Sequence, residues 1–328
     1  MIETRITRLF GIRHPIVQGG MRHISRADLA AAVSNGGGLG LIAVHSFSGP
    51  DALLAEIDKA RALTDRPFGV NLTIIQNMRG ASPDDYVAAI LESGVRIVET
   101  SGANPGKYIP RLKAAGITVV HKCTSVRFAR KAEELGADAV TVVGFEGAGH
   151  LGPDDVPALV LVPRILETVS IPVIAAGGVA RGTQVAAMLA LGAEGVAMGS
   201  RFLLTQEAHM HEAVKERALA VDERGTRVIL RSIGDPTRAI ANQMADRVLK
   251  MEAEGGHLHE ELVSTGGGTA WIDASERGDA EGAAYAIGLS AALIDHLEPA
   301  AEVVARVAAE AEDTIRGRLA GLVRPDPD

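Results

Sequence analysis

Short apolar runs alternate with segments of helical spacing along residues 15–202. The apolar runs predict eight buried strands, at residues 15–21, 38–44, 68–74, 97–102, 118–123, 139–147, 172–178 and 195–202. Helical spacing falls between them, at 26–34, 51–63, 84–92, 108–114, 126–135, 158–169 and 184–191. Strands that are apolar throughout are typical of a parallel sheet covered on both faces. Eight βα units therefore predict the α/β class and a (β/α)8 TIM barrel, with a doubly wound open sheet as the alternative.

Glycines stand at the ends of several predicted helices. Gly94, Gly116, Gly136 and Gly192 each come just before the next apolar run. A glycine at this position readily adopts the left-handed conformation that ends a helix. We therefore expect a positive φ at all four.

The pattern changes after about residue 208, where charged amphipathic segments, including 237–254, predict helices and no new strand series begins. We predict a barrel over 1–208, an inserted helical cap domain over 209–280, and C-terminal helices over 281–328 that return to the barrel. The last part includes expected helices at 283–296 and 299–322. A chain of 328 residues exceeds the ~250 of a plain barrel, which agrees with an added domain.

Charge and cysteine content limit the partners and the cellular compartment that the protein can have. The net charge of −8 and the absence of a Lys/Arg-rich run argue against nucleic acid and anionic membranes as partners. The single cysteine, Cys123, excludes an internal disulfide and fits a reducing compartment. No signal peptide or apolar span of ~20 residues is evident. We expect a cytoplasmic enzyme with a small-molecule substrate, and the sequence leaves its assembly open, with a homodimer as one form.

Two consecutive strands end in turns suited to a phosphate. These turns are Gly177-Gly178 and Gly199-Ser200. Glycine has no Cβ to keep an anion away from the backbone N–H groups, and such turns near helix N-termini form the usual phosphate site of a barrel enzyme. The turns predict a phosphorylated cofactor or substrate; the alternative is that the glycines only permit tight turns.

Other strand ends carry candidate chemistry. The first strand ends at Gly20 and Met21, where a flat ligand could approach the backbone, and Thr73 offers a hydroxyl at the third strand end. Lys122 lies within the fifth strand, and a cation beside an electron-accepting ring would stabilise its reduced anion. The alternative for Lys122 is a structural pair with a carboxylate.

The sixth strand opens into a glycine-rich loop that contains His150. Four glycines within residues 144–152 let the loop wrap a ligand, and a histidine there can exchange a proton near neutral pH. His150 is therefore the candidate catalytic residue. The other histidines lack metal-ligand spacing, so we expect no metal.

These segments together carry a family resemblance. PIVQGGM at 15–21, PFGVNLT at 67–73, HKC at 121–123, GFEGAGH at 144–150, AAGG at 175–178 and MGSR at 198–201 resemble the nitronate monooxygenase (2-nitropropane dioxygenase) family. The resemblance spans nearly the whole chain and lies close to the bacterial NAD(P)H:quinone reductases of the group. FMN-dependent enoyl-thioester reductases are also relatives.

The resemblance implies FMN bound on the barrel under a helical cap. It places Gly20, Met21, Thr73 and Lys122 along the isoalloxazine, Ala148 and Gly149 against the flavin, and Gly177, Gly178, Gly199 and Ser200 at its phosphate, with His150 as the catalytic residue. Two departures stand out. The proline-rich loop associated with NADH is replaced by 74–83, with one proline, which puts NAD(P)H as a second cofactor in doubt. Ala286 stands where relatives place a serine near the flavin.

Three functions follow as hypotheses. The leading one is a nitronate monooxygenase in which His150, neutral at working pH, removes the α-proton of a nitroalkane or orients the nitronate, and O2 completes the conversion to a carbonyl compound and nitrite. The second is an NAD(P)H-dependent FMN reductase of quinones or enoyl thioesters. The third is a flavin-free, phosphate-binding barrel protein.

Overall fold

The computed structural model describes residues 1–74, 81–266 and 270–323. Within them, eight parallel strands form one sheet in the order β1-β9-β8-β6-β5-β4-β3-β2. They are β1 (Ile16–Gln18), β2 (Gly40–Ala43), β3 (Phe68–Ile74), β4 (Ile97–Gly102), β5 (Thr118–Cys123), β6 (Ala139–Val143), β8 (Val173–Ala176) and β9 (Gly195–Met198). A parallel bridge between Val17 and Leu39 joins the two ends of this order. The predicted (β/α)8 barrel is confirmed, and the open-sheet alternative is wrong.

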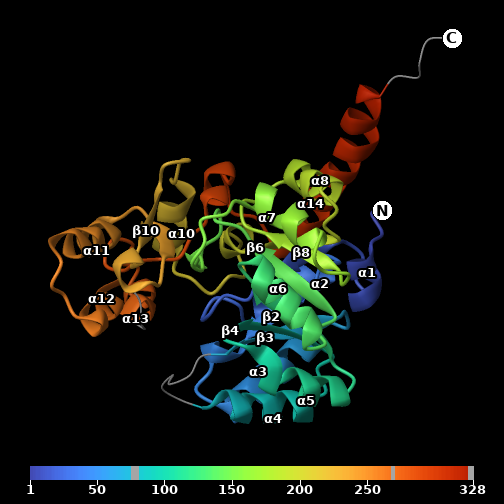
Figure 1. The fold of residues 1–328 in the computed structure, drawn as a ribbon, viewed down its shortest axis with the longest axis horizontal. Helices are drawn as coiled ribbons and strands as arrows, with labels where there is room; N and C mark the ends of the chain where they lie inside the picture. Colours follow the sequence, from blue (N-terminus) through green and yellow to red (C-terminus); the bar gives the residue numbers. More distant parts are fainter. Residues whose placement is uncertain (75–80, 267–269, 324–328) are drawn as a thin grey trace.

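Helices surround the sheet, as the spacing predicts (Figure 1). They are α2 (Ala27–Asn35), α3 (Pro50–Leu63), α4 (Pro83–Ser93), α5 (Ile109–Ala114), α6 (Val126–Glu134), α7 (Ala158–Leu166), α8 (Gly182–Ala190) and the short α9 (Ser200–Leu203). Single 3-10 turns lie at η1 (Val44–Ser46) and η2 (Pro105–Lys107). The expected helix-ending glycines all adopt positive φ, from 70° at Gly94 to 101° at Gly192. The prediction that these four glycines end helices in the left-handed conformation is confirmed.

The barrel interior is layered along its axis. An apolar layer that includes Leu41, Ile97, Val120 and Ala139 fills the amino-terminal half, and the helix α1 (Arg5–Phe10) packs against it. Successive inward-facing positions lie two residues apart along a strand, so the next layer holds Glu99, Lys122 and Thr141. The interior therefore becomes polar toward the carboxyl ends of the strands, where barrel enzymes place their sites.

The region after β9 contains strands as well as helices. β10 (Thr226–Ile229) and β11 (Thr237–Ile240) form an antiparallel hairpin, and β11 also pairs with β7 (Gly149–His150) of the sixth loop. The helix expected over 237–254 is therefore wrong at its start; α11 begins at Gln243, after the N-cap Asn242. The β-branched residues of 226–229 offer a pairing partner, and that tertiary pairing overrides the local helical spacing.

The helix expected over 283–296 is also wrong. Ala286 bridges Ala239 in antiparallel fashion, the N–H of Ile240 donates to the carbonyl of Tyr285, and only η4 (Leu289–Leu293) is a 3-10 helix. A Cβ at Gly288 would lie 2.9 Å from the carbonyl oxygen of Glu146, so this segment needs glycine to lie along the sixth loop.

Further helices complete the chain. They are α10 (Glu212–Leu219), η3 (Arg231–Ile233), α11 (Gln243–Glu254), α12 (His259–Gly266), α13 (Ala270–Glu276), α14 (Ala300–Asp313), the π-helical η5 (Thr314–Leu319) and η6 (Ala320–Leu322). Figure 1 shows α11, α12 and α13 to one side of the barrel, whereas α14 packs against α8 and α2 and its extension projects from the body. The bounds proposed for the three parts stay a prediction.

Candidate active site

The cap hairpin holds the candidate catalytic histidine in place. His150 pairs with Thr237, and Gly149 with Arg238, so two residues of the sixth loop become an edge strand of the hairpin sheet. The N–H of Leu151 then donates to the carbonyl of Pro236 at 2.9 Å. A histidine expected on a free loop is therefore fixed by backbone pairing with a segment far away in the sequence.

Asp235 pairs with His150. Its Oδ2 lies 3.3 Å from Nε2 of the imidazole. Pairing with this carboxylate raises the pKa of His150, against the opposing effect of desolvation by surrounding protein atoms, and pairing with the imidazole lowers the pKa of Asp235. The side chain of His150 is 76% exposed, so a ligand can reach the ring. Sequence reasoning missed Asp235, because nothing in the local pattern connects it to the sixth loop.

Arg238 of the cap hairpin also binds the sixth loop. Its guanidinium donates to the carbonyl of Phe145 and to the hydroxyl of Thr226, both at 2.9 Å, and lies 4.7 Å from the centre of the Phe145 ring. The residue is buried, and burial lowers its pKa. A buried guanidinium that bonds a loop carbonyl and stacks on an aromatic ring restrains that loop more firmly than a surface contact would.

A buried carboxylate links several predicted flavin contacts. Glu99 of β4 accepts hydrogen bonds from Asn71 at 2.7 Å, Thr141 at 3.0 Å and Lys122 at 3.3 Å. The Thr73 hydroxyl donates to Oδ1 of Asn71 at 3.2 Å. The structural pair weighed as an alternative for Lys122 is thus present, yet its side chain keeps 25% exposure at the open end of the barrel. Glu99 was not anticipated from sequence.

The first loop packs closely over this network. A Cβ added at Gly20 would overlap the side chain of Asn71, so a residue other than glycine would displace the amide. A Cβ at the neighbouring Gly19 would meet Met198 at an ordinary 3.6 Å. The glycine at position 20 is therefore required by the approach of the loop to the polar layer.

The two predicted phosphate turns leave backbone donors unused. The N–H groups of Gly177, Gly178, Gly199 and Ser200 donate to no acceptor among the described residues. Gly177 and Gly178 have φ of 90° and 78°, a conformation that favours glycine. This arrangement can accept an anion.

The segment around Gly288 contacts both the second of these turns and the sixth loop. The N–H of Gly288 donates to the Ser200 hydroxyl at 2.9 Å, and a Cβ at Gly288 would lie 3.4 Å from the N atom of Ala148. A Cβ at Gly149 would lie 3.9 Å from Cβ of Ala286, so the alanine that departs from the family pattern adjoins the predicted flavin contacts. The predicted residues thus converge at the carboxyl ends of the strands.

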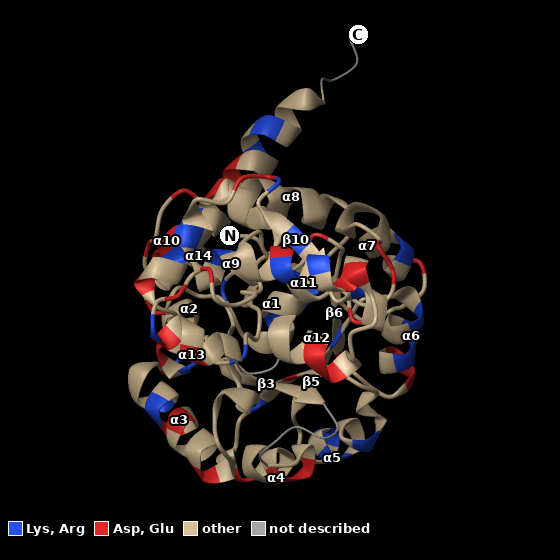
Figure 2. Cartoon of the chain, turned by 90° about the vertical axis from the view of Figure 1, so that its left-hand side faces the viewer, with Lys and Arg blue, Asp and Glu red and all other residues tan. Residues whose placement is uncertain are grey.

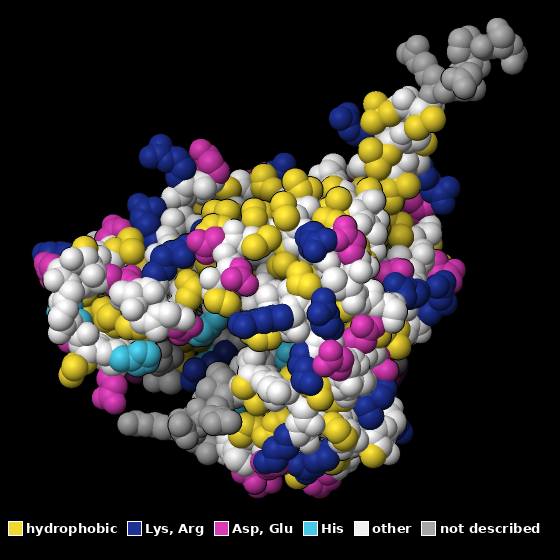
Figure 3. Space-filling model, in the orientation of Figure 1, with side chains coloured by type: hydrophobic (Ala, Val, Ile, Leu, Met, Phe, Trp, Pro, Cys, Tyr) yellow, Lys and Arg dark blue, Asp and Glu magenta, His cyan; other side chains and the backbone are white. Residues whose placement is uncertain are grey.

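This end of the barrel faces the cap. Figure 2 views the molecule from the cap side, with α11, α12 and α13 in front of the strands, and Figure 3 shows a hollow between cap and barrel where histidine and basic side chains gather. Of the 74–83 loop, only 74 and 81–83 lie within the described residues. The described residues contain no group of three metal-binding side chains, and none of the described helices could span a membrane.

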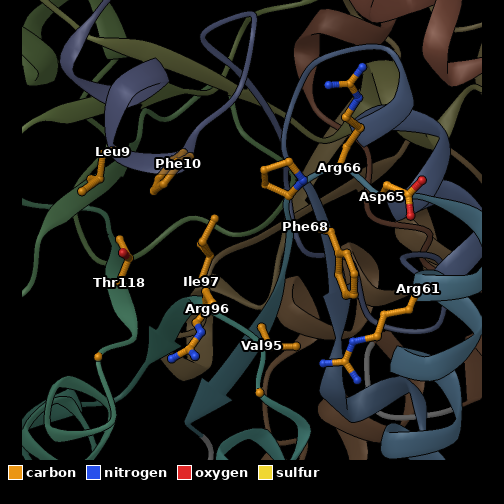
Figure 4. Close-up of a pocket in the computed structure, with 13 residues that line it drawn as sticks. Leu9, Phe10, Arg61, Asp65, Arg66, Phe68, Val95, Arg96, Ile97 and Thr118 are labelled. Carbon is orange, nitrogen blue, oxygen red and sulfur yellow. The ribbon is translucent and has the colours of Figure 1, made fainter.

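A separate cavity of about 600 Å³ lies at the opposite end of the barrel. Phe10 of α1, Phe68, Ile97 and Thr118 line it, at the points where β3, β4 and β5 begin (Figure 4). The amino-terminal face of a barrel carries stability rather than chemistry, so we do not place the reaction there.

Comparisons with known proteins identify the family of the chain. The family model described as nitronate monooxygenase matches residues 3–310. The chain is 41% identical over 250 residues to (3aS,4S,5R,7aS)-5-hydroxy-7a-methyl-1-oxo-octahydro-1H-indene-4-carboxyl-CoA dehydrogenase of Mycobacterium tuberculosis, covering 75% of this chain and 68% of that protein. It is 33% identical over 292 residues to a probable nitronate monooxygenase of Staphylococcus aureus, covering 77% and 82%.

Among solved structures, FabK from Thermotoga maritima superposes with a TM-score of 0.91 at 37% identity, over 98% of this chain and 100% of that one. The full-length family match, the curated relatives and the barrel with its cap all point to one family of oxidoreductases. The chain therefore belongs to the nitronate monooxygenase family.

Proposed function

We propose that this protein is an FMN-dependent nitronate monooxygenase that oxidises alkyl nitronates or nitroalkanes with O2 to a carbonyl compound and nitrite. The observation that carries the proposal is the His150–Asp235 pair at the open end of the barrel. A nitronate is an anion, and a histidine whose pKa is raised by a carboxylate offers it a cationic donor.

The residues present fit FMN. The unused N–H groups of the two glycine turns match the needs of its phosphate, and Gly20 leaves no side chain between the first loop and the ring. Lys122 places an ammonium in the polar layer, on the carboxylate that also binds Asn71, the hydrogen-bond acceptor of Thr73. When bound, FMN supplies the electron acceptor and the centre that reacts with O2.

The ion pair with Asp235 gives the two nitrogens of His150 different roles. The carboxylate lies 3.3 Å from Nε2, whereas Nδ1 is bonded to no described residue, so we assign the shared proton to Nε2 and leave Nδ1 for the substrate. In the cationic ring Nδ1–H donates to a nitronate oxygen. In the neutral ring Nδ1 is the base that removes the α-proton of a nitroalkane. Because Asp235 raises the pKa, the cationic ring persists to higher pH than it would in an unpaired histidine.

A second candidate function involves acyl thioesters. The relative from Mycobacterium tuberculosis is named for action on a CoA thioester. An aspartate-supported histidine can also donate a proton to, or remove one from, an acyl substrate. The candidate is an FMN-dependent oxidoreductase of such thioesters, with NAD(P)H as reductant in the reductase form; reduction of quinones belongs to the same alternative.

An anaerobic experiment separates these functions. FMN-loaded protein is mixed with ethyl nitronate, with NADH or NADPH, or with an acyl-CoA, and the visible flavin absorption is followed. Bleaching by the nitronate, with nitrite and acetaldehyde formed on admission of air, supports the proposal. Bleaching by a reduced nicotinamide or an acyl-CoA, with none by the nitronate, overturns it in favour of the second candidate. Pure protein that binds no FMN would instead favour the flavin-free barrel.

A further inference from the structure

We infer that Glu99 is a positioning residue for Lys122 and that its charge disfavours reduction of the bound flavin. The inference rests on the proposed FMN-dependent function. It starts from the burial of Glu99, a carboxylate that is 2% exposed in the middle of the barrel. A carboxylate is costly to bury unless it is paired and hydrogen-bonded, so the surrounding groups must be arranged around it.

Three strands supply partners to this carboxylate. Oε2 accepts from Asn71 of β3 and from Lys122 of β5, while Oε1 accepts from Thr141 of β6. Asn71 is also the register partner of Glu99, and Thr141 that of Lys122. The contact with Glu99 fixes the position of the Lys122 ammonium. Without it, the long lysine side chain would sample many rotamers.

The Glu99 carboxylate also fixes the orientation of Thr73, which is predicted to contact the flavin. Because Glu99 binds the amide nitrogen of Asn71, the amide oxygen turns toward Thr73 and accepts its hydroxyl at 3.2 Å. The Ser101 hydroxyl in turn donates to Thr73 at 3.1 Å. One buried group therefore sets the position of two side chains that face the proposed flavin site.

The charge of Glu99 has a second consequence. An unpaired Lys122 would place a full positive charge at the floor of the site and strongly favour a reduced, anionic ring. Glu99 offsets that charge at a distance of 3.3 Å. Removing the negative charge while keeping the side-chain shape should therefore make the flavin easier to reduce, since interior charges are only partly screened.

The experiment compares Glu99→Gln with Glu134→Gln, which makes the same change in net charge at the surface pair with Lys131. For each holoenzyme, the FMN midpoint potential and the thermal unfolding temperature are measured. We expect E99Q to bind reduced FMN about tenfold more tightly relative to oxidised FMN, a positive shift of ~30 mV for a two-electron couple. E134Q should match the wild type. A folded E99Q with the wild-type potential overturns the role of the charge.

A second readout tests positioning without the cofactor. Acylation of Lys122 by an amine-reactive reagent, followed by mass spectrometry on the apoprotein, should be about threefold faster or more in E99Q, because the ammonium loses its charged partner. Equal rates overturn the positioning role. If E99Q does not fold, Thr141→Val removes one bond to the carboxylate but keeps its charge, and should raise the acylation rate without moving the potential. Wild-type protein that binds no FMN refutes the proposed function, and the acylation result still decides the positioning role.

Discussion

The imidazole of His150 and the carboxylate of Asp235 lie 3.3 Å apart, one on the sixth barrel loop and the other just before the cap strand β11. The pair joins a side chain of the barrel to a side chain of the inserted region. The pKa of the candidate catalytic residue is thus set by the cap, and changes in the cap should alter the pH dependence of the reaction.

Asp235→Asn should move the pH dependence of nitronate oxidation to lower pH. The carboxylate raises the pKa of His150, so the cationic ring persists at higher pH in the wild type and is lost as pH rises through the raised pKa. Without the carboxylate, the loss begins at lower pH. The measurement is the pH profile of kcat/KM with a preformed nitronate. Asp155→Asn, which removes the nearby exposed partner of Arg231, is the matched control; coincident profiles of D235N and wild type would contradict the role of the pair.

His150→Asn should leave FMN binding unchanged but should slow oxidation of the neutral nitroalkane more than oxidation of the preformed nitronate. Oxidation of the neutral nitroalkane should fall about 10²- to 10⁴-fold, the usual contribution of a general base, whereas the preformed nitronate needs no proton removal and should lose less. Parallel kcat/KM measurements on nitroethane and ethyl nitronate test this. Equal losses on both substrates would refute the base role, and His257→Asn in the cap serves as the control.

Gly20→Ala should destabilise the protein and weaken FMN binding, while Gly19→Ala should do neither. The added methyl group at position 20 overlaps Asn71, and relieving such an overlap costs about 1–3 kcal/mol. At position 19 the methyl group meets only an ordinary contact. Chemical denaturation and FMN titration of the two variants are the measurements. Equal behaviour of the neighbouring variants would show that the close approach at Gly20 has no consequence.

The sequence was sufficient to predict the barrel because its signals are local. Each strand carries its own apolar run, and a helix-ending glycine such as Gly94 or Gly136 needs positive φ whatever surrounds it. The strand ends then follow, since parallel strands place their carboxyl termini at one edge. Residues 20, 73 and 122 were predicted in this way. One hydrogen-bond network connects Thr73 and Lys122 through Asn71 and Glu99, and Gly20 packs against the Asn71 side chain.

The roles of Asp235 and Glu99 and the strand at 237–240 could not be predicted from local sequence pattern. The roles of Asp235 and Glu99 depend on partners on distant segments of the chain, and neither residue lies in a sequence motif. The hairpin strand 237–240 is as compatible with a helix as with a strand until 226–229 pairs with it. One signal was available: Glu99 is an acidic residue inside a predicted buried strand, and such a charge requires a buried partner, for which Lys122 is the natural candidate.

Arg238→Met should reduce catalysis more than it reduces FMN binding. The substitution removes the hydrogen bond to Phe145 and the stacking on its ring, at a cost of about 1–3 kcal/mol to unfolding, and it frees the loop that carries His150. The phosphate turns follow β8 and β9, and the Arg238 side chain forms no hydrogen bond with them. Arg227→Met, an exposed residue of the same hairpin, is the control.

The informative comparison is between kcat and the FMN dissociation constant. If Arg238 positions the loop, R238M lowers kcat about tenfold with little change in cofactor affinity, because a small displacement of a catalytic group is costly. Arg238→Lys should recover only part of the loss, since an ammonium cannot bond Thr226 and Phe145 with the fixed geometry of a guanidinium. Full recovery by lysine, or an equal fall in FMN affinity, would show instead that the residue contributes only charge or only stability.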